Sequence, residues 1–166
     1  MILVGIGANL IAPDGSAPID TCRRAAIALD SMAGFRLVGL SRWFATKPIP
    51  ASDQPDYVNG VASMVVLGSS DPTDLLIRLQ TIESFFGRVR TVPNAPRTLD
   101  LDIVAIGGLV RAAPDPILPH PRCHERAFVL EPLRDVAPNW VHPTTSRTAA
   151  EMLATLGDQG VRPLAG

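Results

Sequence analysis

The pattern of hydrophobic positions along the chain predicts four strands. They are short segments of mostly apolar or alternating residues, bounded by glycine, proline or polar loops: residues 1–7, 35–45, 57–67 and 98–106. In the last segment apolar and polar residues alternate along Leu99-Asp100-Leu101-Asp102-Ile103. Because side chains two apart in a strand point to the same face, Asp100 and Asp102 are expected to project side by side.

Apolar residues at helical spacing predict helices between and after the strands. The expected helices cover residues 18–32, 71–86, 125–136 and 148–156. Asp71 is the expected N-cap of the second helix, with Pro72 at its first helical position, and Thr148 caps the last. Pro132 is expected to break or kink the third helix. The tail, residues 157–166, is expected to fray.

The order of these elements predicts the fold class. Strand, helix, strand, strand, helix, strand is the βαββαβ arrangement of a ferredoxin-like α+β sandwich. The sequence after Ile106 is then a C-terminal extension of helices and loops packed on that core. We expect one domain over residues 1–166, with its core in about residues 1–138.

Composition narrows the class of protein further. The chain has 166 residues, of which 46% are hydrophobic and 19% charged, with a net charge of −1. This balance does not favour a nucleic-acid or membrane partner, and no apolar run approaches the roughly 20 residues of a membrane span. Cys22 and Cys123 make neither a disulfide framework nor a zinc motif. We expect a cytoplasmic monomer, with a dimer as the alternative.

The acid pair at Asp100 and Asp102 is the first candidate for chemistry. Two adjacent carboxylates repel each other unless a cation lies between them, and hard oxygen ligands with open positions suit Mg²⁺. Arg88, Arg90 and Arg97 precede the pair and suit an anionic ligand. The combination suggests metal-assisted phosphoryl chemistry. An isolated Asp-x-Asp motif, by contrast, is more often a solvated strand face.

A second candidate lies on the predicted third strand. Tyr57 and Asn59 are two residues apart, so an aromatic ring and an amide can face one side and bind a planar heterocycle. An ordinary polar strand end is the alternative. The turn at residues 7–10 is either a place where backbone approaches a ligand or a simple strand exit. His120, alone in a proline-rich loop, is more typical of a structural hydrogen bond than of catalysis.

Taken together, these motifs resemble the 6-hydroxymethyl-7,8-dihydropterin pyrophosphokinase family of folate biosynthesis. The matching segments follow the family order from the first strand to about Pro138, and the Arg-Thr-Leu-Asp-Leu-Asp block is highly specific. They are Gly7–Leu10, Thr46–Pro48, Asp53–Asn59, Gln80–Glu83, Gly87–Arg90, Pro96–Asp102, Leu118–Pro121 and Arg126–Leu133.

The resemblance implies a reaction and its participants. ATP would transfer its β,γ-diphosphate to the hydroxymethyl oxygen of the pterin and leave as AMP. The expected cofactor is Mg²⁺, two ions held by Asp100 and Asp102, with ATP as co-substrate. The expected partners are these small molecules only, with no nucleic acid and no membrane. The family assigns no clear protein general base, and metal coordination of the hydroxyl can lower its pKa enough to make one unnecessary.

The resemblance also implies roles for individual residues. Three arginines match the catalytic positions of the phosphate-binding loop: Arg88, Arg90 and Arg97. The matches to the ATP site are Gln80, Glu83, Arg90, Arg97, Ile103, His120 and Arg126. The matches to the pterin pocket are Thr46, Pro48, Ile49, Tyr57, Asn59 and Phe128. Tyr57 and Phe128 would present aromatic surface to the ring, and Asn59 would read its edge.

The chain departs from the family pattern at two places. Between Arg90 and Arg97 the bacterial pattern is one residue longer and carries a tryptophan, where this chain has Asn94-Ala95. An arginine common before the Leu-Pro-His segment is absent, and Asp115 stands there. Two other functions remain as alternatives: another metal-dependent nucleotidyl or phosphoryl transferase on the same core, and a non-enzymatic ligand-binding module.

Overall fold

The computed structural model describes residues 1–48, 50–89 and 96–166. Ile49 and residues 90–95 lie outside the described part, and with them the predictions for Ile49, Arg90 and Asn94-Ala95. Among the described helices, none is both long and apolar enough to cross a membrane.

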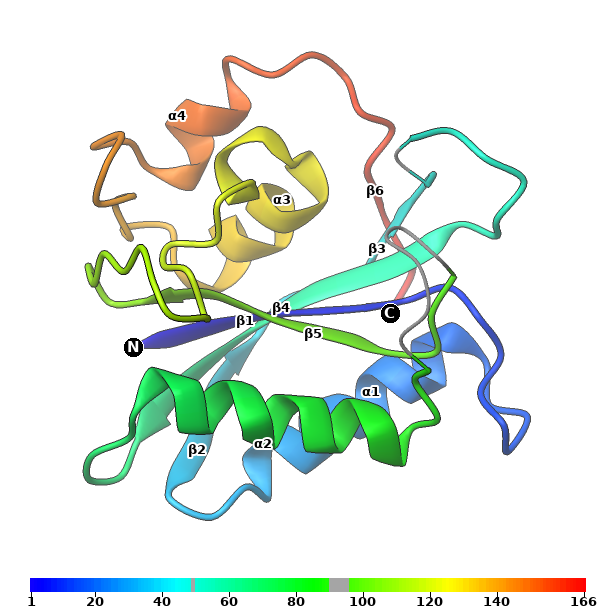
Figure 1. Ribbon diagram of the computed structural model, residues 1–166. Coiled ribbons are helices and arrows are strands. Elements are labelled where there is room, and N and C mark those ends of the chain that lie inside the picture. Colours follow the sequence, from blue (N-terminus) through cyan, green and yellow to red (C-terminus); the bar gives the residue numbers. More distant parts are fainter. Residues whose placement is uncertain (49, 90–95) are drawn as a thin grey trace.

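An antiparallel sheet forms the centre of the molecule (Figure 1). Its main path has the order β5-β1-β4-β3-β6, and β2 also pairs with β4. These strands are β1 (Ile2–Ala8), β2 (Phe35–Leu40), β3 (Phe44–Thr46), β4 (Tyr57–Val66), β5 (Asp100–Ile106) and β6 (Arg162–Pro163). With β1 and β4 in the middle and β5 and β2 beside them, the order confirms the predicted ferredoxin-like core.

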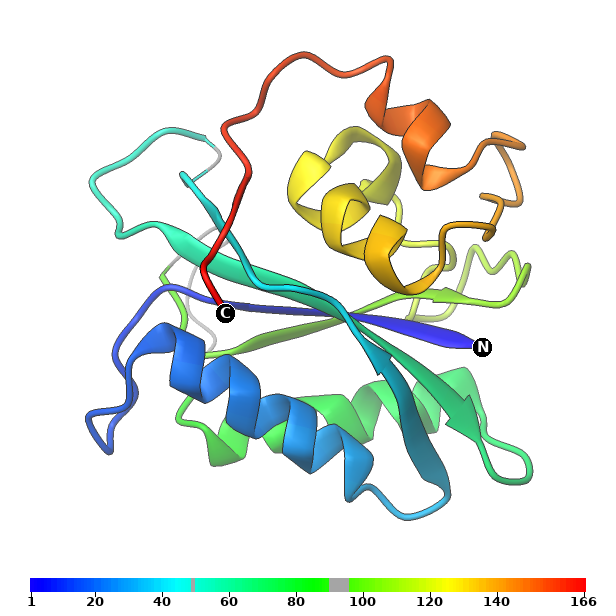
Figure 2. The same ribbon diagram turned by 180° about the vertical axis from the view of Figure 1, so that it is seen from behind.

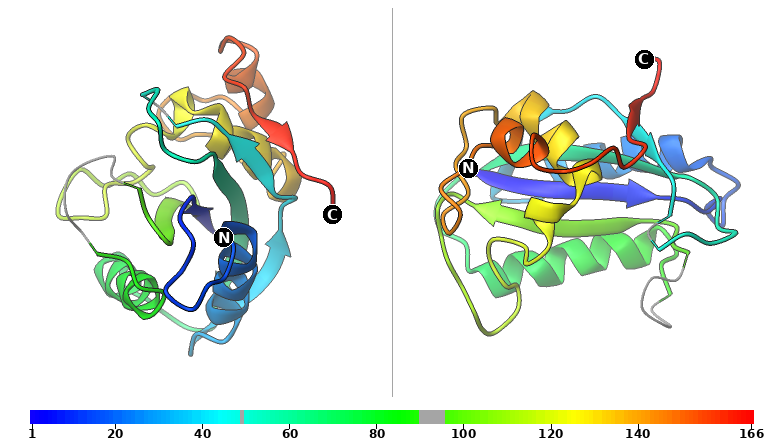
Figure 3. Two further views of the ribbon diagram at one scale, coloured as in Figure 1. Left: turned by 90° about the vertical axis from the view of Figure 1, so that its right-hand side faces the viewer. Right: turned by 90° about the horizontal axis from the view of Figure 1, so that it is seen from above.

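Helices cover both faces of the sheet (Figures 2 and 3). One face carries α1 (Pro18–Asp30) and α2 (Pro72–Phe85). The other carries the C-terminal extension, which contains the 3₁₀ turn η1 (Cys123–Glu125), α3 (Ala127–Val136) and α4 (Ala149–Leu153). The predicted caps are confirmed, since the Asp71 side chain accepts a hydrogen bond from Thr73 N and Thr148 forms a capping box with Glu151.

The alternation of side chains along the strands produces two hydrophobic cores. On β1, Ile2, Val4 and Ile6 pack toward α1 and α2, whereas Leu3 packs toward α3 and α4. On β5, Leu101 and Ile103 join the first core. The residues between them therefore face the side of α3, and there the sheet carries the candidate site.

The segment predicted as one strand over residues 35–45 forms two. Both β2 and β3 pair with β4, but the register changes between Leu40, which lies opposite Ala62, and Phe44, which lies opposite Asn59. Trp43 lies at the break, and a Cβ on Gly60 of β4 would come within 2.6 Å of its ring. The Trp43 ring occupies the space that the absent side chain of Gly60 leaves, and the pairing register with β4 changes at this point.

Two expectations for the extension differ from the structure. Helix α3 continues through Pro132 to Val136, so the break that was one of the two alternatives there is absent, and Leu130 and Leu133 are buried against the sheet. The tail, which we expected to fray, returns to the sheet as β6, where Leu164 N donates to Trp43 O at 2.8 Å. Strand β6 contains only two residues, which are too few to produce a periodic pattern in the sequence.

An ion pair fastens α3 to the strand break. Asp135 accepts hydrogen bonds from the Arg42 backbone N and Nε and from Nη2, each at 3.0 Å. These contacts hold the pKa of Asp135 below its ordinary value. A lowered folded-state pKa stabilises the protein above the unfolded-state pKa of about 4, and this contribution is lost as the pH falls through the folded-state value.

We therefore predict that Asp135→Asn lowers the Tm by about 2 °C at pH 7, since Arg42 is largely exposed and solvent screens the pair. At about pH 3 the difference from the wild type should be smaller, because protonation of Asp135 competes with the ion pair there. Thermal denaturation followed by circular dichroism at both pH values tests this. Glu131→Gln, which removes a local ion pair with Arg134 on the same helix, is the matched control. Equal destabilisation by Asp135→Asn at both pH values would contradict the prediction.

Candidate active site

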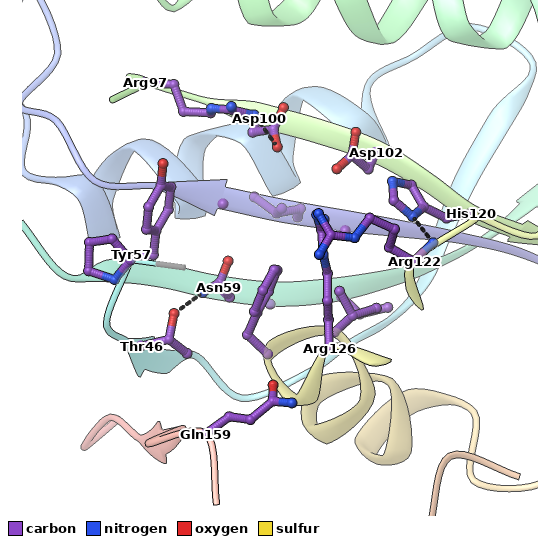
Figure 4. Close-up of a pocket in the computed structure, with 18 of the residues that line it drawn as sticks. Thr46, Tyr57, Asn59, Arg97, Asp100, Asp102, His120, Arg122, Arg126 and Gln159 are labelled. Carbon is purple, nitrogen blue, oxygen red and sulfur yellow. Dashed lines mark hydrogen bonds and ion pairs between the residues drawn. The ribbon is translucent and has the colours of Figure 1, made fainter. Parts of the chain in front are cut away.

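The floor of the candidate site is the face of the sheet where β5 carries two carboxylates and β1 carries glycine (Figure 4). Asp100 and Asp102 lie opposite Gly7 and Gly5 of β1. A Cβ on Gly7 would come within 2.9 Å of Asn59 Oδ1, so a side chain there would displace that amide. The two glycines therefore keep the face beside the carboxylates open.

The carboxylates lie in an unfavourable electrostatic environment that guanidinium groups partly offset. Burial raises the pKa of Asp102, and the negative charge of Asp100 raises it further. Arg97 Nη1 lies 2.9 Å from Asp100 Oδ2, and Arg88 Nη1 lies 2.5 Å from Asp100 Oδ1. Additional positive charge beside Asp102 would therefore be favourable.

Arg88 is oriented toward Asp100 by the end of helix α2. The Glu83 side chain is only 2% exposed and forms an ion pair with Arg88. Gly87, with a φ of +84°, provides the left-handed conformation that ends the helix, and Arg88 N then donates to Glu83 O at 3.1 Å. Glu83 thus balances the charge of Arg88 and limits its freedom before a ligand arrives.

A buried asparagine holds Arg97 near the loop that precedes Tyr57. Asn9 is 1% exposed. Its Oδ1 accepts a hydrogen bond from Arg97 N at 3.0 Å, and its backbone N donates to Arg97 O at 3.1 Å. Its Nδ2 also donates to Gln54 Oε1 and Pro55 O, each at 3.2 Å. The turn after β1 therefore connects the segment at Arg97 to the loop that contains Gln54 and Pro55.

The wall formed by β3, β4 and α3 combines aromatic surface with amide and hydroxyl groups. Asn59 Nδ2 donates to Thr46 Oγ1 at 2.9 Å, which fixes the orientation of the amide. Tyr57 rises from β4 beside it, and Phe128 comes from α3. Burial is the main cause that raises the pKa of Tyr57, so its hydroxyl stays protonated near neutral pH. Such a wall suits a flat ring with donors and acceptors on its edge.

The remaining wall is cationic. Arg126 points toward Asp102 and His120 in Figure 4, and its guanidinium carbon lies 5.5 Å from the centre of the Phe128 ring. His120 Nδ1 accepts a hydrogen bond from Arg122 N at 3.1 Å, so the neutral ring carries its proton on Nε2. Burial, and then Arg126, lower the pKa of His120. The ring is therefore a neutral hydrogen-bond donor near pH 7.

These walls enclose a pocket of about 410 Å³. Ten residues predicted from the sequence line it: Thr46, Pro48, Tyr57, Asn59, Arg97, Asp100, Asp102, His120, Arg126 and Phe128. Four predicted residues do not line it: Gln80, Glu83, Arg88 and Ile103. Arg88 and Glu83 act behind Asp100, whereas Ile103 is 4% exposed in the core on the opposite face. The predicted ATP contacts of Gln80, Glu83 and Ile103 stay predictions.

The sequence reasoning missed several residues of the pocket. Gly5 lines the pocket because its position on β1 faces the two carboxylates. The spacing of Gly5 and Gly7, two residues apart on one strand, could have indicated this. Arg122 and Glu125 belong to the loop and the 3₁₀ turn before α3, and they form an ion pair at 2.6 Å. Gln159 comes from the tail, and nothing in the local sequence marked it.

The donor set fits a hard divalent cation that keeps other ligands. Within the residues that the structure describes, no group of three or more His, Cys, Asp or Glu side chains could hold a metal ion. Burial, and then the charge of Asp100, raise the pKa of Asp102. Two adjacent carboxylates of this kind fit Mg²⁺, which commonly takes one or two carboxylates together with water and phosphate oxygens.

Sequence comparisons place the chain among known enzymes. The family model described as 7,8-dihydro-6-hydroxymethylpterin-pyrophosphokinase matches residues 3–138. A 2-amino-4-hydroxy-6-hydroxymethyldihydropteridine pyrophosphokinase from Pseudomonas aeruginosa is 38% identical over 165 residues, which cover 99% of this chain and 97% of that protein. Its counterpart from Synechocystis is 34% identical over 163 residues, covering 98% of this chain and 80% of the relative.

Some relatives are much longer than this chain. The folic acid synthesis protein fol1 of Pneumocystis carinii is 37% identical over 134 residues, which cover 81% of this chain but 18% of that protein. Among solved structures, wild-type HPPK-DHPS from Plasmodium falciparum matches with a TM-score of 0.69 and 11% identity. That match covers 92% of this chain and 44% of the other, and it supports the fold alone.

The extent of the family match and the identity to full-length bacterial relatives agree with the geometry of the pocket. The chain belongs to the 7,8-dihydro-6-hydroxymethylpterin-pyrophosphokinase family.

Proposed function

We propose that this chain transfers the β,γ-diphosphate of ATP to 6-hydroxymethyl-7,8-dihydropterin in folate synthesis. The hydroxymethyl oxygen forms a bond to the β-phosphorus, the bond from that phosphorus to the α–β bridging oxygen breaks, and AMP leaves. The hydroxyl proton is lost to solvent. The observation that carries the proposal is one pocket in which paired carboxylates and guanidinium groups meet an aromatic and amide wall.

The aromatic and amide wall is the proposed pterin subsite. The ring would contact Tyr57 and Phe128, while the edge would hydrogen bond to Asn59 and Thr46. Because the Asn59–Thr46 hydrogen bond fixes the amide, the acceptor Oδ1 is preorganised for a donor on the ring. The hydroxymethyl group would then project toward the carboxylates, which lie across the sheet face in Figure 4.

The cationic wall is the proposed triphosphate subsite. Arg97 and Arg126 would neutralise phosphate charge, and the Nε2 proton of His120 would donate to a phosphate oxygen. From behind Asp100, Arg88 would offset the negative charge of that carboxylate and add to the positive potential at the diphosphate. Fixed cations favour charge on the transferred group in the transition state without further reorganisation.

Asp100 and Asp102 are the proposed Mg²⁺ ligands, with two ions expected. Bound Mg²⁺ would supply electrostatic stabilisation of the phosphates and acidify the attacking hydroxyl. The role of the protein is to hold both carboxylates on one rigid strand and to keep the opposite β1 positions free of side chains. ATP and the pterin would complete the coordination sphere with water.

The identity of the products tests the proposed reaction. Incubated with ATP, Mg²⁺ and 6-hydroxymethyl-7,8-dihydropterin, the chain should release one AMP for each pterin diphosphate formed, as measured by chromatography with mass spectrometry. Without the pterin, AMP should not accumulate. Release of ADP, or pterin-independent consumption of ATP, would assign the pocket to another phosphoryl or nucleotidyl transfer.

Removing either carboxylate tests the metal role. We predict that Asp100→Asn and Asp102→Asn each lower kcat by about 100-fold or more at saturating Mg²⁺, because each removes a charged ligand from the transition state. Asp20→Asn is the matched control, since Asp20 is an exposed acid whose pair with Arg23 lies on α1. A kcat within a few-fold of the wild type in either site variant would refute the assignment.

The proposed pterin subsite predicts a selective effect at Asn59. Asn59→Asp keeps the shape of the side chain but removes the donor to Thr46 and adds charge. The KM for the pterin should rise about tenfold or more, with little change in the KM for ATP. Steady-state kinetics with each substrate varied measure the two constants, and Asn139→Asp on the surface is the control. A rise confined to the KM for ATP would place the pterin elsewhere.

A further inference from the structure

The pocket contains one side chain from beyond the segment that the family model matches. Gln159 belongs to the tail after α4, whereas the match ends at residue 138. Figure 4 shows its amide at the edge of the pocket, across from the acid pair and beside the start of α3.

The Gln159 amide clamps the junction between η1 and α3. Its Oε1 accepts a hydrogen bond from Ala127 N at 2.9 Å, and its Nε2 donates to Glu125 O at 3.0 Å. Arg126, the N-cap residue of α3, provides no side-chain hydrogen bond to the helix. A residue 32 positions away in sequence thus supplies the cap that the helix itself lacks.

The clamped junction carries two residues of the pocket. Arg126 lies between the two backbone groups that Gln159 binds, and Phe128 follows Ala127. The Arg126 guanidinium lies over the Phe128 ring, so movement of the junction would shift both groups together. One of them belongs to the proposed triphosphate subsite and the other to the proposed pterin subsite.

The other end of the tail is anchored on the strands of the aromatic and amide wall. Strand β6 pairs with β3, with Arg162 opposite Ala45, next to Thr46 of the pocket. Arg162 Nη2 also lies 2.9 Å from Asp56 Oδ2, beside Tyr57. The tail from Gln159 to Arg162 therefore connects the start of α3 to the strands β3 and β4.

We infer that Gln159 is a positioning residue that sets the place of Arg126 and Phe128 relative to the strands, and so sets the affinity for both substrates. The identification of those substrates as ATP and the pterin rests on the proposed function. It assigns Gln159 no contact with the reacting atoms. Its effect should therefore appear in KM rather than in kcat.

Three variants separate positioning from simple stability. Gln159→Met keeps length and volume but removes both hydrogen bonds, and Gln159→Glu keeps the acceptor for Ala127 N but loses the donor to Glu125 O. Thr155→Ala is the control, because it removes one hydrogen bond of the C-terminal segment, from Thr155 Oγ1 to Met152 O, away from the pocket.

Steady-state kinetics should show a split between the constants. Gln159→Met should raise the KM for ATP and for the pterin by about five- to tenfold with kcat within about twofold. Gln159→Glu should give smaller rises, and Thr155→Ala should leave both KM values unchanged. Unchanged KM values in Gln159→Met, a loss confined to kcat, or equal losses in the Met and Glu variants would each overturn the inference.

Hydrogen exchange at the Ala127 amide tests the clamp without any turnover. The exchange rate should rise about tenfold in Gln159→Met and remain near the wild-type value in Thr155→Ala. If the wild-type chain forms no pterin diphosphate, the proposed function fails, while this exchange measurement still decides whether the clamp exists. An unchanged rate in Gln159→Met would overturn the clamp whatever the activity.

Discussion

The repulsion between two carboxylates on one strand is the constraint around which the site is built. Strand alternation sends Leu101 and Ile103 into the core and leaves Asp100 and Asp102 on the other face, where burial and mutual charge raise the pKa of Asp102. Added positive charge would relieve this arrangement. Two arginines offset part of it at Asp100, and the proposed Mg²⁺ and substrate would complete the balance.

The rest of the fold maintains the opening above this strand. Glycine at positions 5 and 7 of β1 keeps side chains away from the carboxylates, and the C-terminal extension supplies the walls. Arg126 and Phe128 enter from α3, which the tail clamps through Gln159. The ferredoxin-like core thus provides the floor, while the segments packed on it decide which ligand the pocket fits.

The fold and the acid pair could be predicted from local periodicity, whereas His120, Arg126 and Phe128 were predicted only from the family resemblance. The alternation around Asp100 and the cap at Asp71 are signals within a few residues, and both were confirmed in the structure. The contacts that sequence reasoning missed are long-range. The break at Trp43 depends on Gly60 of another strand, and the position of Gln159 depends on the return of the tail to β3. No periodic pattern encodes such contacts.

Asp100 and Asp102 are proposed to bind nucleotide through Mg²⁺. Isothermal titration calorimetry of a non-hydrolysable ATP analogue, with and without Mg²⁺, tests this role most directly in the wild type and in the Asp100→Asn/Asp102→Asn double variant. We predict that Mg²⁺ lowers the Kd of the wild type by about tenfold or more and has little effect on the variant. An affinity of the wild type that does not depend on Mg²⁺, or the same Mg²⁺ effect in both proteins, would contradict this role of the two carboxylates.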